Sequence, residues 1–121
     1  MFLYKELTEK IIKAAVEVHK TLGRGFLEKV YENALLFELI DIGLKAETQK
    51  PIDVYYKKNK VGSYYSDILV EEKIILELKV AKDISTEHYA QLLNYLKATD
   101  IKLGIILNFG RSTLQIKRII I

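Results

Sequence analysis

The chain has no cysteine, only one proline among its 121 residues, and no long apolar run. Without cysteine it has no disulfide framework and no thiolate that could act as a nucleophile or bind a metal. The absence of thiols fits a reducing compartment, so we expect a cytoplasmic protein. Charged residues interrupt each apolar run before it reaches the length of a membrane span, and the first residues lack the basic and then apolar order of a signal peptide. We therefore expect no membrane partner.

The composition is that of one folded domain. Half of the residues are hydrophobic and 29% are charged, which is ordinary for a globular protein. No repeat, low-complexity tract or linker divides the chain, so we expect a single domain over residues 1–121, near the size at which a second subunit often helps stability. A formal net charge of +3, from 19 basic and 16 acidic side chains, permits a polyanionic partner but is too small to require one.

Hydrophobic periodicity predicts three helices and five strands. The expected helices cover residues 7–22, 27–42 and 86–98, and the expected strands cover 52–56, 61–70, 74–80, 103–109 and 114–120. Gly23 and Gly43 end the first two helices, Ser85 or Thr86 caps the third, and Pro51 opens the first extended segment. The order α-α-β-β-β-α-β-β predicts an α/β (α+β) fold, in which helices flank a mixed β-sheet.

The second and third predicted strands form a hairpin that brings two carboxylates together. If Val70 pairs with Ile74 across a turn at 71–73, Asp67 lies directly opposite Glu77. Strand alternation places one set of apolar residues on a single face, namely Ile68, Val70, Ile74, Leu76, Leu78 and Val80. The two carboxylates share the other face with Leu69 and Ile75, so we expect a helix to cover that face in part and leave the charges in a cleft.

Opposed carboxylates on a sheet require a positive charge between them, because like charges that face each other destabilise the pair. A divalent cation would supply that charge, and Mg²⁺ or Mn²⁺ would bind the oxygens of Asp67 and Glu77, with the carbonyl of Leu78 as a further ligand. Lys79 lies on the same face as Glu77 and could assist an attacking water or a phosphate. The alternative is a solvated face on which Glu77 and Lys79 form a simple salt bridge.

Two more polar residues could complete such a site. Glu28 begins the second helix, where it could support a cation, although first-turn glutamates more often interact only with the helix dipole. Gln91 lies on a partly apolar stripe of the third helix, where it could hydrogen-bond a water or a phosphate, or be an ordinary amide at the helix edge. His88 is expected at the surface, and His19 is expected to cap or pack at the end of the first helix.

These residues carry a resemblance to a known family. Residues 25–31, Gly-Phe-Leu-Glu-Lys-Val-Tyr, fit the signature GxxExxY, and Asp67 is followed after nine residues by Glu77-Leu78-Lys79, a pattern of the PD-(D/E)xK type in which Ser66 replaces the proline. The chain resembles the GxxExxY proteins of the PD-(D/E)xK nuclease superfamily over nearly all of its length. The resemblance implies a restriction-endonuclease-like core and a metal-dependent phosphodiesterase site. By position it assigns Glu28, Asp67, Glu77, Lys79 and Gln91 to that site.

The function expected from this reasoning is hydrolysis of nucleic acid, expected to be DNA, by a water that a bound Mg²⁺ or Mn²⁺ activates. One alternative is a non-catalytic module of the same fold that binds nucleic acid or protein. Another is a subunit that acts only within a larger complex. A homodimer would suit a nuclease with one site per chain, because cutting both strands of a duplex needs two sites.

Candidate nucleic-acid contacts lie in the loop between the first two strands. Lys57, Lys58 and Lys60 could reach a phosphate backbone, and several tyrosines frame them. Tyr31 of the GxxExxY signature is a further candidate contact. The alternative for the lysines is that they only solubilise the hairpin tip and protect a sheet edge.

Overall fold

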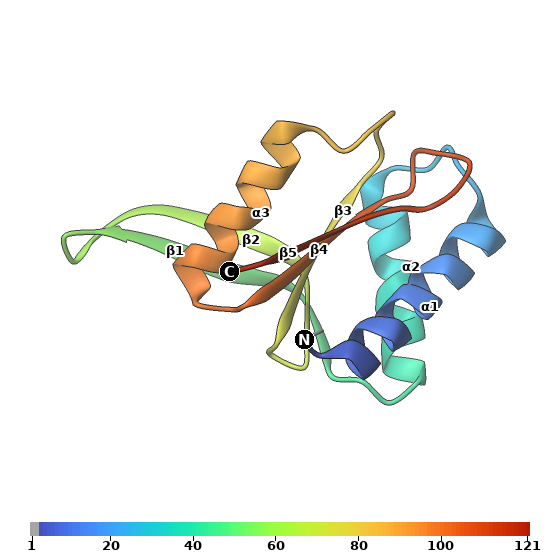
Figure 1. Ribbon diagram of the computed structural model, residues 1–121, viewed down its shortest axis with the longest axis horizontal. Coiled ribbons are helices and arrows are strands. Elements are labelled where there is room, and N and C mark those ends of the chain that lie inside the picture. Colours follow the sequence, from blue (N-terminus) through green and yellow to red (C-terminus); the bar gives the residue numbers. More distant parts are fainter. Residues whose placement is uncertain (1–2) are drawn as a thin grey trace.

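The computed structural model describes residues 3–121, which form three helices and five strands in the order predicted from the sequence (Figure 1). The helices are α1 (Lys5–Leu22), α2 (Glu28–Asp41) and α3 (Thr86–Thr99). The strands are β1 (Ala46–Tyr56), β2 (Asn59–Val70), β3 (Ile74–Lys79), β4 (Leu103–Asn108) and β5 (Gln115–Ile120). The predicted fold class, a mixed sheet flanked by helices, is confirmed.

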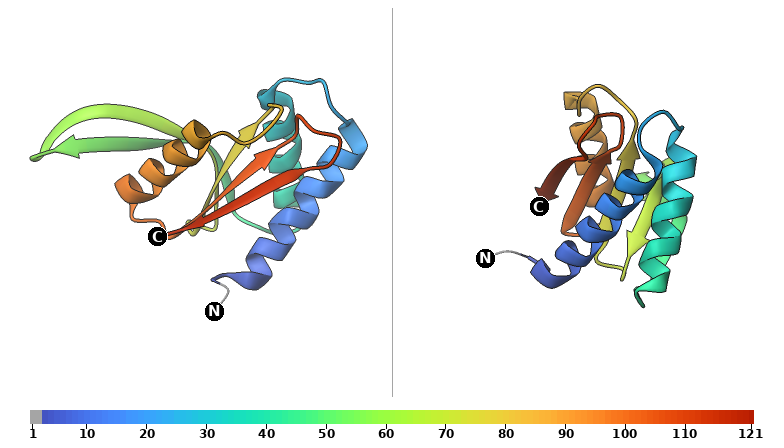
Figure 2. Two further views of the ribbon diagram at one scale, coloured as in Figure 1. Left: turned by 45° about the horizontal axis from the view of Figure 1, so that its top comes forward. Right: turned by 90° about the vertical axis from the view of Figure 1, so that its right-hand side faces the viewer.

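The five strands form one sheet in the order β1-β2-β3-β4-β5. Neighbouring strands are antiparallel except β3 and β4, which run parallel and are connected by α3. Helices α1 and α2 lie together on one face of the sheet, and α3 lies on the other (Figure 2). No helix among residues 3–121 is both long enough and apolar enough to cross a membrane.

The larger core lies between the sheet and the α1–α2 pair. The apolar face predicted for the β2–β3 hairpin is buried here, through Ile68, Val70, Ile74, Leu76 and Leu78. Each such side chain stabilises the fold by roughly 1.5–3 kcal/mol relative to exposure. A slip of one residue would turn this whole set to the other face, so the core fixes the register of the hairpin.

A smaller core lies between the sheet and α3. The other face of the hairpin contributes Leu69 and Ile75 to it. The α3 side chains in this core are Leu92, Tyr95 and Leu96. The prediction that a helix covers this face is therefore confirmed, and α3 limits the access of water to the neighbouring carboxylates.

Local sequence sets the ends of the helices. Gly23 and Gly43 follow α1 and α2 with φ of 70° and 87°, a left-handed conformation that glycine adopts without strain. At the start of α3 the hydroxyl of Ser85 accepts a hydrogen bond from the backbone N–H of His88 at 3.2 Å. In return Nδ1 of His88 accepts the backbone N–H of Ser85 at 3.1 Å. This reciprocal cap confirms Ser85 as the capping residue and gives His88 a structural role.

The β1–β2 hairpin is longer than predicted. Strand β1 begins at Ala46, so Pro51, expected to open the strand, lies inside it and opposite Tyr65. An edge strand accepts proline because the missing N–H would face away from its neighbour. Lys57 and Lys58 form a tight turn with φ of 48° and 69°. The hairpin projects past α3, away from the body of the molecule (Figures 1 and 2).

Asn108 joins the loops that follow β3 and β4. Its buried amide accepts the backbone N–H of Ala81 at 3.0 Å and donates to the carbonyl of Ala81 at 2.9 Å. The same amide donates to Oε1 of Gln115 at 3.0 Å. Gly110 packs on this segment so closely that a Cβ there would overlap the backbone nitrogen and oxygen of Ala81. These contacts fix the end of β3 at which Lys79 lies.

We expect Gly110→Ala to lower the free energy of unfolding by about 1–3 kcal/mol, because the overlapping neighbour is backbone and cannot rotate away. Urea denaturation of the two proteins measures the difference. Gly62→Ala is the matched control, since its new Cβ would lie 3.6 Å from Tyr64 and 3.8 Å from Val54, which is ordinary contact. Equal stability of Gly110→Ala and the parent protein would contradict the proposed packing.

Candidate active site

The candidate site lies where β2 and β3 separate. Their ladder runs from Val70 opposite Ile74 to Ile68 opposite Leu76 and is not continued at the next pair. Beyond that point side chains replace the backbone pairing. The carboxylate of Asp67 accepts the backbone N–H of Leu78 at 2.8 Å. The backbone N–H of Asp67 is in turn 3.4 Å from a carboxylate oxygen of Glu77. The structure thus brings Asp67 and Glu77 together, as the hairpin register predicted.

Burial makes this pair of carboxyl groups unusually easy to protonate. Glu77 is only 4% exposed. Its burial, together with the negative charge of Asp67, raises the pKa of Glu77 to about 9. Burial also raises the pKa of Asp67, although the hydrogen bond from Leu78 opposes that rise. At neutral pH the pair therefore retains a proton, because two ionised carboxylates at this position would repel each other.

Lys79 and Gln91, which the sequence suggested separately, are in direct contact. The ammonium of Lys79 donates to Oε1 of Gln91 at 2.9 Å. The amide nitrogen of Gln91 donates to the hydroxyl of Tyr95 at 3.0 Å. The positive charge of Lys79 lowers the pKa of both Asp67 and Glu77, though by less than burial raises them. Helix α3 therefore positions the lysine beside the carboxyl pair.

The acidic residue that α2 brings to the site is Glu32. Glu28 is exposed at the start of the helix, and its side chain makes no hydrogen bond or ion pair with any residue in the described range 3–121. Glu32, one turn later, is 3% exposed, and after burial its negative charge is a smaller contribution to the raised pKa of Asp67. It accepts hydrogen bonds from Lys29 at 2.7 Å and from Gln49 at 3.0 Å.

The sequence contained a signal for Glu32 that the GxxExxY pattern obscured. Glu32 shares a helical stripe with Leu35 and Leu39, both completely buried. A carboxylate on such a stripe must meet a partner in the interior, because an unpaired buried charge is costly. The pattern instead directed attention to Glu28, on the exposed first turn.

Strand β1 is also irregular at the level of the carboxyl pair. Thr48 pairs with Ile68 and Lys50 with Ser66, but Gln49, which the register would place opposite Asp67, is unpaired. Gln49 has a φ of 53°, which is unusual for a residue other than glycine and costs roughly 1–3 kcal/mol. Its side-chain amide reaches α2 and donates a hydrogen bond to Glu32. Nothing in the local sequence indicates this break.

The side chains of β2 change face across this break. Simple alternation predicts that Tyr64 and Ile68 share a face. Instead Ile68 belongs to the core beneath α1 and α2, whereas the ring of Tyr64 lies 5.7 Å from the ring of Tyr95 on α3. Ile52, which pairs with Tyr64, also belongs to the core beneath α3. The outer half of the hairpin therefore turns toward α3, and Asp67 lies at the position where the side chains of β2 change face.

The candidate nucleic-acid contacts divide into two groups. Tyr31 is fully buried, donates a hydrogen bond to the carbonyl of Gly23 at 2.6 Å and stacks on Phe109 with a centroid distance of 4.5 Å. A side chain in this position cannot contact nucleic acid, so that expectation is corrected. The three lysines lie exposed at or beside the hairpin tip, namely Lys57, Lys58 and Lys60.

The donor chemistry of the site suits a hard divalent cation. No group of three or more His, Cys, Asp or Glu side chains within residues 3–121 is close enough to hold a metal by itself. Mg²⁺ does not need one, because it takes one or two protein carboxylates and keeps several waters. Asp67 and Glu77 provide two carboxylates that repel each other when ionised, and Glu32 adds negative charge nearby. A cation would relieve that repulsion.

Fold and site together define the class of protein. A mixed sheet carries an aspartate and a Glu-x-Lys sequence on two adjacent strands, with helices on both faces, which is the arrangement of a PD-(D/E)xK domain. The family model described as PD-(D/E)XK nuclease superfamily matches residues 5–119. The chain belongs to the PD-(D/E)XK nuclease superfamily.

Comparison with solved structures supports the same fold. The crystal structure of SSO0001 matches with a TM-score of 0.55 and 17% sequence identity, covering 94% of this chain and 77% of that chain. At this identity the likeness concerns the fold alone. No curated protein matches the chain significantly.

We expect the metal-free protein to lose stability as the pH rises through the neutral range. Folding raises the pKa of Glu77 from about 4.5 to about 9, so between these values the folded protein holds a proton that the unfolded chain releases. Stability from this group is complete below the lower pKa and is lost as the pH approaches the upper one. Urea denaturation in EDTA across this pH range measures the effect.

The variant Glu77→Gln should flatten that pH dependence, because its amide does not titrate. Glu28→Gln, which changes an exposed glutamate, is the control and should keep the slope of the parent protein. Stability that rises with pH in the parent protein, or an unchanged slope in Glu77→Gln, would show that the carboxyl pair does not hold the proton.

Proposed function

We propose that the protein is a nuclease dependent on Mg²⁺ or Mn²⁺ that hydrolyses phosphodiester bonds of nucleic acid, with DNA as the expected substrate, and that it belongs to the GxxExxY branch of its superfamily. The observation that carries the proposal is the meeting of Asp67 and Glu77 beside the Lys79–Gln91 hydrogen bond. Carboxylates and a lysine from two adjacent strands are suited to hold a cation and a phosphate side by side.

Asp67 and Glu77 hold the cation in this proposal, and the carbonyl of Leu78 is a further ligand. When bound, the ion supplies a water of lowered pKa and polarises a phosphoryl oxygen. Glu32 takes the supporting role that the sequence assigned to Glu28, because it is buried and accepts a hydrogen bond from Gln49, which lies at the level of Asp67 on β1. This part of the site therefore draws one carboxylate from each of α2, β2 and β3.

The remaining residues act on the phosphate and the water. The ammonium of Lys79 neutralises negative charge that develops on the phosphate as the attacking oxygen bonds to phosphorus and the bond to the leaving oxygen breaks. Gln91 holds that ammonium in place through its 2.9 Å hydrogen bond, and in this proposal it also orients the water. Tyr95 fixes the Gln91 amide from the other side.

The direct test is cleavage of labelled linear, branched and single-stranded substrates with Mg²⁺ and with EDTA. We expect cleavage that requires the metal and that Asp67→Ala and Lys79→Ala abolish. Absence of cleavage on all substrates, or undiminished cleavage by these variants, would contradict the proposal. Absence of cleavage together with binding that is salt-sensitive, needs no metal and survives Glu77→Gln would instead identify a non-catalytic binding module.

A second comparison distinguishes the two glutamates of α2. We expect Glu32→Gln to lower the rate roughly 10–100-fold, as removal of a residue that supports metal ligands commonly does. Glu28→Gln should leave the rate unchanged, because Glu28 is exposed and does not contribute to the electrostatics of Asp67 or Glu77. Circular dichroism checks that both variants are folded. A slower rate in Glu28→Gln than in Glu32→Gln would restore the role that the sequence pattern assigned to Glu28.

A homodimer remains part of the proposal for duplex substrates. One chain provides one candidate site, so cleavage of both strands in one encounter needs two copies. Sedimentation of the protein with and without duplex DNA tests this point.

A further inference from the structure

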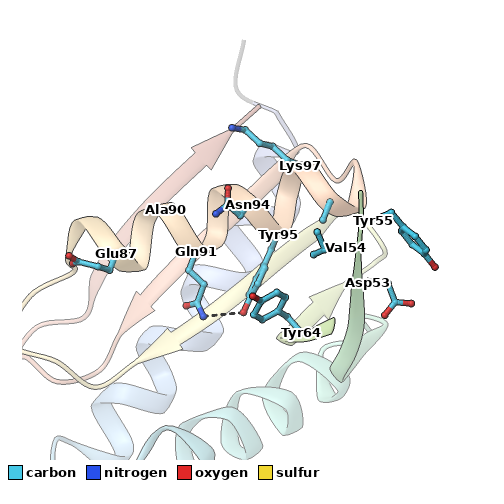
Figure 3. Close-up of a pocket in the computed structure, with 11 residues that line it drawn as sticks. Asp53, Val54, Tyr55, Tyr64, Glu87, Ala90, Gln91, Asn94, Tyr95 and Lys97 are labelled. Atoms are coloured by element: carbon cyan, nitrogen blue, oxygen red, sulfur yellow. Dashed lines mark hydrogen bonds between the residues drawn. The ribbon is translucent and has the colours of Figure 1, made fainter. Parts of the chain in front are cut away.

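A groove lies between the outer half of the β1–β2 hairpin and α3. Its volume is about 850 Å³, within the range of pockets that hold small organic molecules. Figure 3 shows its walls, with Val54 and Tyr64 on the hairpin side and Gln91, Asn94 and Tyr95 on the helix side. None of the roles proposed above uses Tyr64, Asn94 or the hairpin wall.

The groove begins at the candidate active site. Gln91 lines its inner end and receives the hydrogen bond from Lys79, the residue assigned to the phosphate. Tyr95 lines the same end and accepts the other hydrogen bond of Gln91, shown as a dashed line in Figure 3. A nucleic-acid strand held at the candidate active site could therefore continue into the groove.

The walls offer a flat ring and amide groups. Tyr64 is 51% exposed, although its ring packs at 5.7 Å from that of Tyr95 and is tilted by 43°. Tyr95 supports the ring of Tyr64 on one side and leaves it half-exposed. Asn94, on the facing helix, carries an amide that can donate and accept hydrogen bonds. An aromatic face next to amide donors and acceptors is suited to a planar heterocycle with polar edges.

Charged side chains of both signs line the groove. Lys97 and Glu87 line it from α3 and Asp53 lines it from β1, whereas Lys57 and Lys58 lie exposed at the hairpin tip, outside the lining. Asp53, also at the groove, forms an ion pair with Lys60 at 3.2 Å and accepts a hydrogen bond from Ser63 at 3.1 Å. Its carboxylate is thus partly neutralised, and the exposed lysines at the hairpin tip are the groups that could bind a phosphate backbone.

We propose that this groove binds an unpaired nucleobase next to the scissile phosphate, so that the preferred substrates have single-stranded or splayed nucleotides there. The proposal rests on the nuclease function proposed above and narrows its substrate class. A base within a regular duplex has both faces covered by its neighbours, so only an unstacked base can lie on Tyr64. DNA and RNA share this chemistry, and the experiment separates them.

The test measures binding in EDTA, where no cleavage occurs. Fluorescence anisotropy follows four labelled probes: a short single-stranded DNA, an RNA of the same sequence, the same DNA strand with abasic sites, and a blunt DNA duplex. We expect the DNA or RNA strand with bases to bind more tightly than the abasic strand and the duplex. Tyr64→Ala should weaken binding of that strand roughly tenfold, within the range that stacking on an aromatic ring contributes.

Two further variants keep the result interpretable. Tyr64→Phe retains the ring and should keep the affinity of the parent protein. Tyr65→Ala is the matched control, because Tyr65 is the next residue of the same strand, is 55% exposed and does not line the groove. Equal affinity of Tyr64→Ala and the parent protein for the strand with bases, or an equal loss on the abasic strand, would overturn the proposal.

The result also separates this inference from the nuclease proposal. Stacking at Tyr64 in a protein that never cleaves would contradict the nuclease function and leave the groove as a base-binding site. Metal-dependent cleavage that Tyr64→Ala leaves unchanged on single-stranded and splayed substrates would support the nuclease and overturn the base-binding groove.

Discussion

The contact between Asp67 and Glu77 is the constraint on which the rest of the site depends. Two carboxyl groups that are largely withdrawn from water cannot both be ionised without a compensating charge, so they hold either a proton or a cation. The sheet accommodates them by breaking its ladder: both strands that neighbour β2 lose regular pairing at this level. The surrounding cores, which lie on both faces of the sheet, stabilise that break.

The break has a geometric consequence beyond the carboxyl pair. It turns the outer half of the β1–β2 hairpin toward α3, which places Tyr64 against Tyr95 and forms the groove. It also lets Gln49 reach Glu32 on α2. One local interruption therefore brings polar groups from α2, β1, β2 and β3 to one place, while Gln91 adds the contribution of α3.

The sequence predicted the parts of this arrangement that follow from local rules. The turn at 71–73 and the alternation of apolar residues were sufficient to place Asp67 against Glu77, and the stripe on the third helix was sufficient to bring Gln91 to that face. Glu32 was missed because the GxxExxY pattern directed attention to Glu28, and Gln49 was missed because its position depends on tertiary contacts. A strand break with positive φ at a glutamine has no sequence signature, and once it occurs alternation no longer predicts which face a side chain takes.

The central claim is that the Asp67–Glu77 pair holds a divalent cation, and anomalous scattering from a crystal soaked in Mn²⁺ tests it most directly. Mn²⁺ prefers oxygen ligands as Mg²⁺ does and can be located by its own signal. The account predicts one ion with an oxygen of Asp67 and an oxygen of Glu77 in its coordination shell. A crystal soaked to saturation with Mn²⁺ that shows no ion at this pair, or ions bound only elsewhere, would contradict the claim.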